Sequence, residues 1–256
     1  MIHPQAIIDP TAVIGADVSV GPFSIIGANV TIGANTIVES HVVIKGPTTI
    51  GENNRIYQFS TVGEATPDLK YQGEETTLVI GNNNVIREGV TIHRGTVQDR
   101  AETFIGNDNL IMAYAHVGHD SVIGNNVILV NNVALAGHVI VGDYAILSGY
   151  VLVHQYCHIG AHCFIGMGSG VGMDVAAYTM VMGAPAQTRG LNLEGLRRRD
   201  FSKESIKAIK QAYKIVYRDG LKVEAALEAL IPLAEAFPEV AVFSESIKQS
   251  TRGLVR

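Results

Sequence analysis

The chain has 256 residues, of which 47% are hydrophobic, and its formal net charge is −5 at pH 7. This acidic balance argues against a general nucleic-acid-binding protein, which needs a basic face. No apolar run reaches the roughly 18 residues of a membrane-spanning helix. The start, Met1-Ile2-His3-Pro4, lacks the basic and apolar regions of a secretory signal. We therefore expect a cytoplasmic protein without integral membrane association.

An aliphatic residue recurs at every sixth position through two long stretches of the chain. The first stretch runs from Ile8 to Val62 and the second from Ile105 to Val171. A period of six matches neither a helix nor a flat strand, and it is typical of a parallel β-helix built from hexapeptide repeats. Gly, Asn and Asp recur between the aliphatic residues, where they would supply the positive φ of sharp corners. Three hexads, or about 18 residues, would form each coil of a triangular prism.

Two polar segments interrupt this period and predict inserted loops. The first covers about residues 63–79 and the second about residues 95–103. Insertions in a solenoid become loops, often on the binding face. The two cysteines, Cys157 and Cys163, would lie on different faces of the coil, which predicts free buried thiols rather than a disulfide. We expect the solenoid to span residues 1–189.

Residues 190–256 follow a helical pattern and predict a small C-terminal α-helical domain. Ser202 is a plausible N-cap for a helix whose apolar stripe runs from Ile206 to Tyr217. A second helix is expected over about 223–230 or a little beyond and a third over about 238–248, with Pro238 at a permitted first-turn position. The predicted fold is therefore mainly β, a parallel β-helix whose open end the helices would cap.

Six of the nine histidines fall between Ile105 and Gly172. Residues 18 apart in this stretch would stack on successive coils about 4.8 Å apart. This stacking gathers one polar patch at a corner: His119, Asp120, Gly137, His138, His154 and Gln155. The patch suits acyl transfer, with His119 as general base, Asp120 as the group that orients its ring, and the Gly137 N–H as oxyanion donor. Because the stacked columns contain no Ser or Cys, we expect the substrate hydroxyl to attack directly.

Two other classes of function fit the same residues. His116, His119 and His138 could approach a tetrahedral zinc ion together, as in a trimeric zinc-dependent hydratase of the γ-carbonic-anhydrase type. The histidines could also be tolerated corner residues of a non-catalytic β-helix scaffold. Metal analysis of the purified protein separates the zinc hypothesis from the acyl-transfer hypothesis.

The C-terminal region contains two basic clusters. Arg197, Arg198 and Arg199 follow Asn192 and Glu194, and their forked donors suit a pyrophosphate. A second cluster would form one face of a helix and could steer an acidic partner: Lys203, Lys207, Lys210, Lys214 and Arg218. Either cluster could instead be an ordinary solvated face.

Several motifs together resemble a known family. They are Asp68-Leu69-Lys70-Tyr71, Ile92-His93-Arg94-Gly95, Tyr114 to Asp120, Leu135 to His138, Val153-His154-Gln155 and Asn192 to Arg199. This combination is similar to the acyl-carrier-protein-dependent UDP-N-acetylglucosamine O-acyltransferases that begin lipid A synthesis in Gram-negative bacteria. The resemblance covers essentially the whole chain. It implies a cytoplasmic homotrimer of left-handed β-helices, with active sites in the clefts between subunits and no metal or other cofactor.

The resemblance also assigns roles to residues of this sequence. It implies that His119 is the base acting on the glucosamine 3-hydroxyl and that Gly137 is the oxyanion donor. It implies substrate contacts at Asp68, Lys70, His116, His138, His154 and Gln155, and nucleotide contacts at Asn192, Glu194, Arg198 and Arg199. Whether the acceptor is the ordinary sugar or its 3-amino analogue stays open.

Met167 departs from part of the family pattern in an informative way. It occupies what resembles the acyl-chain ruler position, where some members have Gly. A thioether side chain would shorten the apolar groove by a few methylenes. We therefore expect a 3-hydroxyacyl donor of about ten carbons, rather than the roughly fourteen that a Gly ruler implies. Replacing Met167 by Gly would test this expectation.

Overall fold

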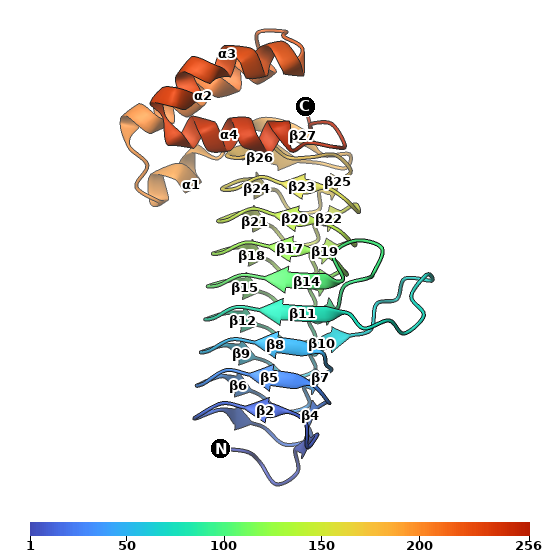
Figure 1. The fold of residues 1–256 in the computed structure, drawn as a ribbon. Coiled ribbons are helices and arrows are strands. Elements are labelled where there is room, and N and C mark those ends of the chain that lie inside the picture. Colours follow the sequence, from blue (N-terminus) through green and yellow to red (C-terminus); the bar gives the residue numbers. More distant parts are fainter.

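The protein is a left-handed parallel β-helix that carries a small helical domain on one end, as described by a computed structural model of residues 1–256 (Figure 1). The N-terminus lies at the open end of the prism, and the C-terminus lies beside the helices at the other end. The predicted hexapeptide-repeat fold is confirmed. None of the helices has the length and apolar character needed to cross a membrane.

The strands form three sheets, one for each face of the prism. The first face contains β1 (Ile7–Ile8), β4 (Ile25–Ile26), β7 (Val43–Ile44), β10 (Thr61–Glu64), β13 (Thr91–His93), β16 (His116–Val117), β19 (Ala134–Leu135), β22 (Leu152–Val153) and β25 (Gly170–Val171). The second face contains β2 (Val13–Ile14), β5 (Val30–Ile32), β8 (Thr48–Ile50), β11 (Thr77–Ile80), β14 (Glu102–Ile105), β17 (Val122–Ile123), β20 (Ile140–Val141) and β23 (His158–Ile159).

The third face contains β3 (Ser19–Val20), β6 (Ile37–Val38), β9 (Arg55–Ile56), β12 (Val85–Ile86), β15 (Leu110–Ile111), β18 (Ile128–Leu129), β21 (Ile146–Leu147), β24 (Phe164–Ile165), β26 (Thr179–Met182) and β27 (Gln187–Leu191). All strand pairs are parallel except β26 with β27, which is antiparallel. Where the period is uninterrupted, partners lie 18 residues apart, as in Ile128 opposite Ile146. The recurring aliphatic residues point inward and form one continuous core along the prism.

Of the residues predicted to supply the positive φ of the corners, Asn and Asp do so most often, and glycine does so at fewer positions. Asn35 has a φ of 58°, whereas Gly33 is not in the left-handed region. Gly33 is needed for another reason, because a Cβ there would lie 2.5 Å from the carbonyl carbon of Gly51 on the next coil. Aromatic residues also occupy left-handed corners: His138 and Tyr156 both have a φ of 64°. Their rings stack at 4.2 Å, which offsets part of the backbone cost.

The two inserted loops leave the prism at the same corner, between the first and second faces. The first connects β10 to β11 over residues 65–76, and the second connects β13 to β14 over residues 94–101. Both are shorter than the sequence suggested, because the flanking strands extend into the polar segments. The buried Arg94 connects them by donating to the Gly63 carbonyl at 2.6 Å and to the Tyr71 hydroxyl at 3.2 Å. Figure 1 shows both loops projecting on one side of the prism.

Four helices follow the last strand: α1 (Leu193–Arg198), α2 (Lys203–Tyr217), α3 (Val223–Ala236) and α4 (Pro238–Lys248). Ser202 caps α2 by accepting from the Ser205 N–H, as predicted. The short helix α1 was not expected, and α3 runs past residue 230 to Ala236, an extension whose direction the sequence analysis allowed. The helices share a buried core with Ala176, Ala177 and Tyr178 of the last coil, so they cover the end of the prism. Both cysteines are free and buried, as predicted.

Candidate active site

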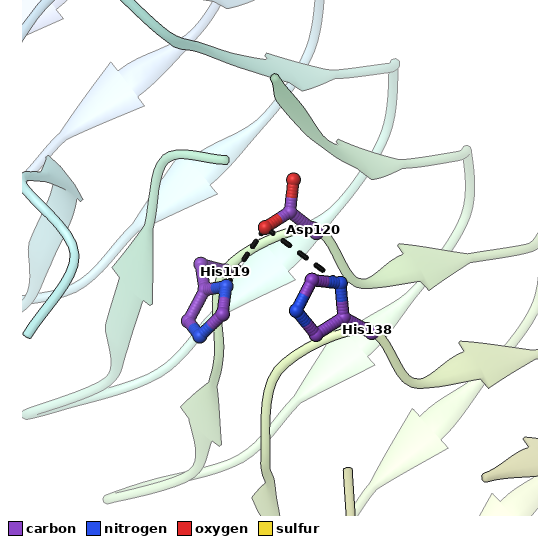
Figure 2. A group of neighbouring side chains, drawn as sticks. All are labelled: His119, Asp120 and His138. Atoms are coloured by element: carbon purple, nitrogen blue, oxygen red, sulfur yellow. Dashed lines mark hydrogen bonds and ion pairs between the residues drawn. The ribbon is translucent and has the colours of Figure 1, made fainter. Parts of the chain in front are cut away.

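The corner between the first and second faces brings His119 and Asp120 together. Nδ1 of His119 lies 2.8 Å from Oδ2 of Asp120 (Figure 2). Burial opposes ionisation of Asp120, but hydrogen bonds from His119 and Thr96 outweigh it and hold the pKa of the carboxyl below its usual value. An ionised carboxylate can only accept, so Nδ1 of His119 carries the proton, and in the neutral ring Nε2 keeps a free lone pair. This is the arrangement that a general base requires.

Thr96 holds Asp120 in place and was missed by the sequence analysis. Its N–H donates to Oδ1 of Asp120 at 2.9 Å, and its hydroxyl donates to Oδ2 at 2.7 Å. The Asp120 N–H in turn donates to the Thr103 hydroxyl at 2.8 Å. Thr96 belongs to the second inserted loop. This loop folds back against the corner of the next coil and so brings Thr96 to the Asp120 carboxylate. The interruption of the hexad period was the available signal.

Gly137 lies on the coil next to His119, as the 18-residue register predicts. The Gly137 N–H donates to no acceptor within the chain. A Cβ on this residue would lie 2.5 Å from Cε1 and Nε2 of the His119 ring. Glycine is therefore required by the ring beside it, and its N–H is free on the coil next to that of His119.

The first inserted loop brings a second carboxylate to the same nitrogen. Oδ2 of Asp68 lies 3.9 Å from Nε2 of His119. The Lys70 N–H donates to the other oxygen of Asp68 at 2.8 Å and so fixes the turn, while the Lys70 side chain is exposed. The loop therefore forms one wall around the basic nitrogen.

The remaining histidines of the patch differ in their surroundings. His116 is half-buried, and its Nδ1 lies 2.8 Å from the Thr91 hydroxyl. Burial and the neighbouring His119 lower the pKa of His116, and burial with the neighbouring His116 lowers the pKa of His93 to about 4. Both rings are thus neutral near pH 7. His154 and Gln155 are exposed at the same corner, and Nδ1 of His154 lies 3.1 Å from the Gln155 carbonyl oxygen.

The only potential metal-binding group consists of His119, Asp120 and His138, whose ligand atoms lie within 4.8 Å of one another. His116 is not part of this group, so the three histidines considered for zinc do not converge. Oδ2 of Asp120 already accepts from His119 and Thr96, and Nδ1 of His138 lies 2.7 Å from Asp99. Nδ1 of His119, Nδ1 of His138 and Oδ2 of Asp120 are thus engaged in hydrogen bonds within the protein, and a zinc ion bound through these atoms would have to displace those bonds.

The residues considered for the nucleotide lie on the third face. Asn192, Glu194, Arg198 and Arg199 line a cavity of about 310 Å³ together with apolar residues of the third face: Ile146, Phe164 and Met180. Asn192 caps α1 by accepting from the Gly195 N–H, and its own amide donates to the His162 carbonyl at 3.0 Å. Arg197 does not line this cavity, so the three arginines are divided between two surfaces.

Arg199 is the more constrained of the two cavity arginines. It donates to the Tyr144 carbonyl at 2.9 Å, and its guanidinium lies 5.2 Å above the Tyr144 ring. Arg198 is exposed and pairs with Glu194 at 3.1 Å. Because this cavity is on the third face and His119 is at the corner between the other two, one chain does not bring the two sets of residues into one site.

Met167 lies at the corner between the third and first faces, and 77% of its surface is exposed. The first face separates it from the column that contains His119. Between the two, the outward-facing residues of the first face are small or apolar: Ala134, Leu152 and Gly170. This part of the surface carries no charged side chain at these three positions, and Met167 lies at its far edge.

The prism of hexapeptide repeats, together with a His–Asp pair beside a free backbone N–H, defines a hexapeptide-repeat acyltransferase. A profile described as bacterial transferase hexapeptide matches residues 11–46, 29–64 and 102–137. A second profile, described as UDP N-acetylglucosamine O-acyltransferase, domain 2, matches residues 174–255.

Full-length relatives identify the family. The chain is 66% identical to the acyl-[acyl-carrier-protein]–UDP-N-acetylglucosamine O-acyltransferase of Pseudomonas fluorescens SBW25 and 68% identical to that of Pseudomonas aeruginosa PAO1, over 100% of this chain and 99% of each relative. The Moraxella catarrhalis UDP-N-acetylglucosamine O-acyltransferase structure has a TM-score of 0.98 at 49% identity, covering 100% of this chain and 99% of the other. The Francisella novicida UDP-N-acetylglucosamine acyltransferase structure also has a TM-score of 0.98, at 45% identity, covering 100% and 94%.

This chain therefore belongs to the acyl-[acyl-carrier-protein]–UDP-N-acetylglucosamine O-acyltransferase family, and it is an O-acyltransferase.

Proposed function

We propose that the chain transfers an (R)-3-hydroxyacyl group from acyl carrier protein to the 3-hydroxyl of UDP-N-acetylglucosamine, the first step of lipid A biosynthesis. The names of relatives at 66–68% identity support both substrates. The observation that carries the chemistry is the pairing of His119 with Asp120, which puts the lone pair of the neutral ring on Nε2, with Gly137 and its free N–H on the adjacent coil.

The reaction follows from these two groups. Nε2 of His119 removes the proton from the sugar hydroxyl while its oxygen attacks the thioester carbonyl carbon. The Gly137 N–H donates to the negatively charged oxygen of the tetrahedral intermediate. The intermediate then collapses, the carbon–sulfur bond breaks, and the protonated His119 gives its proton to the departing thiolate, which leaves as the thiol. Asp120 stabilises the imidazolium in between.

The site is proposed to form between subunits of a homotrimer. The cavity of Asn192, Glu194, Arg198 and Arg199 lies on the third face, and His119 lies at the opposite corner. Two copies packed side by side place the corner of one against the third face of the next, and a closed ring of such heterologous contacts makes three equivalent sites. The free cysteines agree with action in a reducing cytoplasm.

The carrier protein is proposed to approach the helical domain. Arg197, Lys203, Lys207 and Lys210 line a cavity of about 660 Å³ beside Phe201 and Ile206. In a chain of net charge −5, this basic surface would steer an acidic partner to the end of the prism. Met167 is proposed to limit the acyl chain to about ten carbons, as in 3-hydroxydecanoyl.

One assay tests the central proposal. The purified protein is mixed with 3-hydroxydecanoyl acyl carrier protein and UDP-N-acetylglucosamine, and the product is measured by mass spectrometry, with the 3-amino sugar nucleotide in a parallel reaction. We expect the acylated sugar nucleotide from the wild type and none from His119→Ala, which should still bind UDP-N-acetylglucosamine. Full activity in His119→Ala would show that the base is another group.

The convergence of His119, Asp120 and His138 leaves one metal-dependent activity, zinc-assisted hydration, to be tested beside acyl transfer. Its test is metal analysis of protein purified without chelators. Stoichiometric zinc together with carbon dioxide hydration would support the hydratase, and transfer activity that survives treatment with a chelator would support the acyltransferase.

A further inference from the structure

His138 has a carboxylate of its own, supplied by the second inserted loop. Nδ1 of His138 lies 2.7 Å from Oδ2 of Asp99, a residue 39 positions earlier in the chain. The His138 side chain is almost entirely buried, while that of Asp99 is about half exposed. Two separate Asp–His pairs therefore lie side by side at the active corner, with the His119 and His138 ring centroids 4.8 Å apart.

Asp120 cannot serve both histidines well. Its Oδ2 already accepts from Nδ1 of His119 at 2.8 Å and from the Thr96 hydroxyl at 2.7 Å. The same oxygen lies 3.8 Å from Nδ1 of His138, which is beyond hydrogen-bonding distance (Figure 2). Without Asp99, the nearest carboxylate for His138 would be the one that orients His119, and the two rings would compete for it.

Packing fixes the plane of the His138 ring but does not determine which of its two nitrogens carries the proton. The ring stacks on Tyr156 at 4.2 Å with 5° between the planes, and it meets His119 edge to face at 86°. Asp99 determines the tautomer of His138, because an ionised carboxylate only accepts hydrogen bonds and so requires a proton on Nδ1 of the ring. Nε2 of His138 then keeps its lone pair, and in Figure 2 this nitrogen lies on the side of the ring that faces His119.

We infer that Asp99 is a positioning residue for the acyl transfer. It holds His138 in the tautomer with the proton on Nδ1 and keeps this ring away from Asp120. His119 is therefore the one histidine that hydrogen-bonds to Asp120, and Nε2 of His138 is an acceptor for the bound substrates. The effect on catalysis rests on the proposed function, whereas the effect on the tautomer of His138 does not.

The first experiment reads the tautomer directly. Histidine side chains of the full-length protein are labelled with ¹⁵N, and the two ring nitrogens of His138 are assigned by comparison with His138→Gln. In the wild type we expect a protonated Nδ1 and an unprotonated Nε2. Asp99→Ala should lose this preference and Asp99→Glu should retain it in part. Glu102→Gln is the matched control, because this carboxylate follows the same loop and accepts its one side-chain hydrogen bond from the Thr77 hydroxyl, at 3.5 Å. An unchanged His138 tautomer in Asp99→Ala would overturn the inference.

The second experiment measures catalysis in the same variants. We expect kcat of Asp99→Ala to fall by roughly tenfold to a hundredfold, the scale associated with a displaced catalytic group. The KM for UDP-N-acetylglucosamine should change less, Asp99→Glu should recover part of the rate, and Glu102→Gln should behave as the wild type. A tautomer change with an unaltered kcat would overturn the positioning role. If the wild type has no transferase activity, the proposed function fails, and the ¹⁵N result still decides whether Asp99 sets the tautomer.

Discussion

Gly137 and His119 are matched to each other across adjacent coils: the position of a Cβ on Gly137 lies 2.5 Å from Nε2 of the His119 ring. The same glycine has an N–H without a partner in the chain. One residue thus leaves room for the proposed base and offers a free donor for the proposed oxyanion, and both properties depend on the 18-residue register of the solenoid.

Substitution of Gly137 by Ala should therefore displace the base. The added methyl group overlaps the His119 ring, which must rotate away from Asp120, and we expect kcat to fall about a hundredfold, since a displacement of this size misaligns the proton transfer. Steady-state kinetics with the carrier-bound donor provide the measurement. Gly149→Ala is the control, because a Cβ there lies at an ordinary 3.4 Å from the Asn131 carbonyl. A near-normal kcat in Gly137→Ala would contradict the arrangement described for His119.

Mixed trimers should test whether the site is shared between subunits. When His119→Ala and Arg198→Ala chains are co-expressed, random assembly unites an intact corner with an intact third face in about a quarter of the sites. We expect about a quarter of the wild-type activity, measured on trimers whose mass is verified by light scattering.

A mixture of His119→Ala with His138→Ala is the control for this experiment. Both defects lie on the same wall, so no site should recover. A lack of recovery in the first mixture, despite mixed trimers, would contradict a site built from two chains.

Shortening Met167 should lengthen the preferred donor. Met167→Gly removes an exposed side chain at the far edge of the first face, and we expect the preference to move from about ten carbons towards about fourteen, with each added methylene worth about 1–3 kcal/mol of discrimination. Competition between donors of different length, read by mass spectrometry, measures the shift. Met167→Leu conserves the volume and should keep the wild-type preference. The ruler hypothesis fails if Met167→Gly leaves the preference unchanged.

Reversing the charge of two lysines on α2 should weaken binding of the carrier-bound donor without affecting binding of the sugar nucleotide. In Lys207→Glu/Lys210→Glu we expect the apparent KM for the carrier-bound donor to rise about tenfold, with a weaker dependence on salt, because electrostatic steering is lost. The affinity for UDP-N-acetylglucosamine should stay the same. Lys222→Glu/Lys248→Glu makes the same change in net charge on exposed residues outside the cavity. Equal KM values in the two double variants would argue against docking at this surface.

Because of His162, the free energy of unfolding should be lower in mild acid than at neutral pH. Burial and the neighbouring Arg199 lower the pKa of His162 to about 4, against 6.5 for an unperturbed ring. As pH falls from 6.5 towards 4, the unfolded chain takes up a proton that the folded chain refuses, so the free energy of unfolding decreases. His162→Phe keeps the stack between Tyr144 and Tyr178 and removes this titration.

Urea unfolding of the wild type and His162→Phe at pH 7 and pH 5, at one protein concentration, measures the difference. The variant should lose less stability between the two pH values. Phe is compatible with a left-handed corner, since Phe23 and Phe59 have φ values of 61° and 65°. Equal losses in both proteins would show that His162 does not titrate as described.

The sequence by itself determined the prism and most of the active corner. In an uninterrupted solenoid, each residue pairs with the one 18 positions later, so local spacing already placed Gly137 and His138 beside His119 and Asp120. The buried aliphatic column and the free cysteines followed from the same period.

Only the tertiary structure decided which groups hold the corner in place. Asp68, Thr96 and Asp99 lie in loops that break the period, so their distance along the chain carries no information about what they touch. The division of the arginines is of the same kind: Arg198 and Arg199 line the third-face cavity and Arg197 does not, because the unexpected helix α1 sets their directions. A repeat propagates its own geometry from coil to coil, whereas loops and packed helices take theirs from contacts between distant residues.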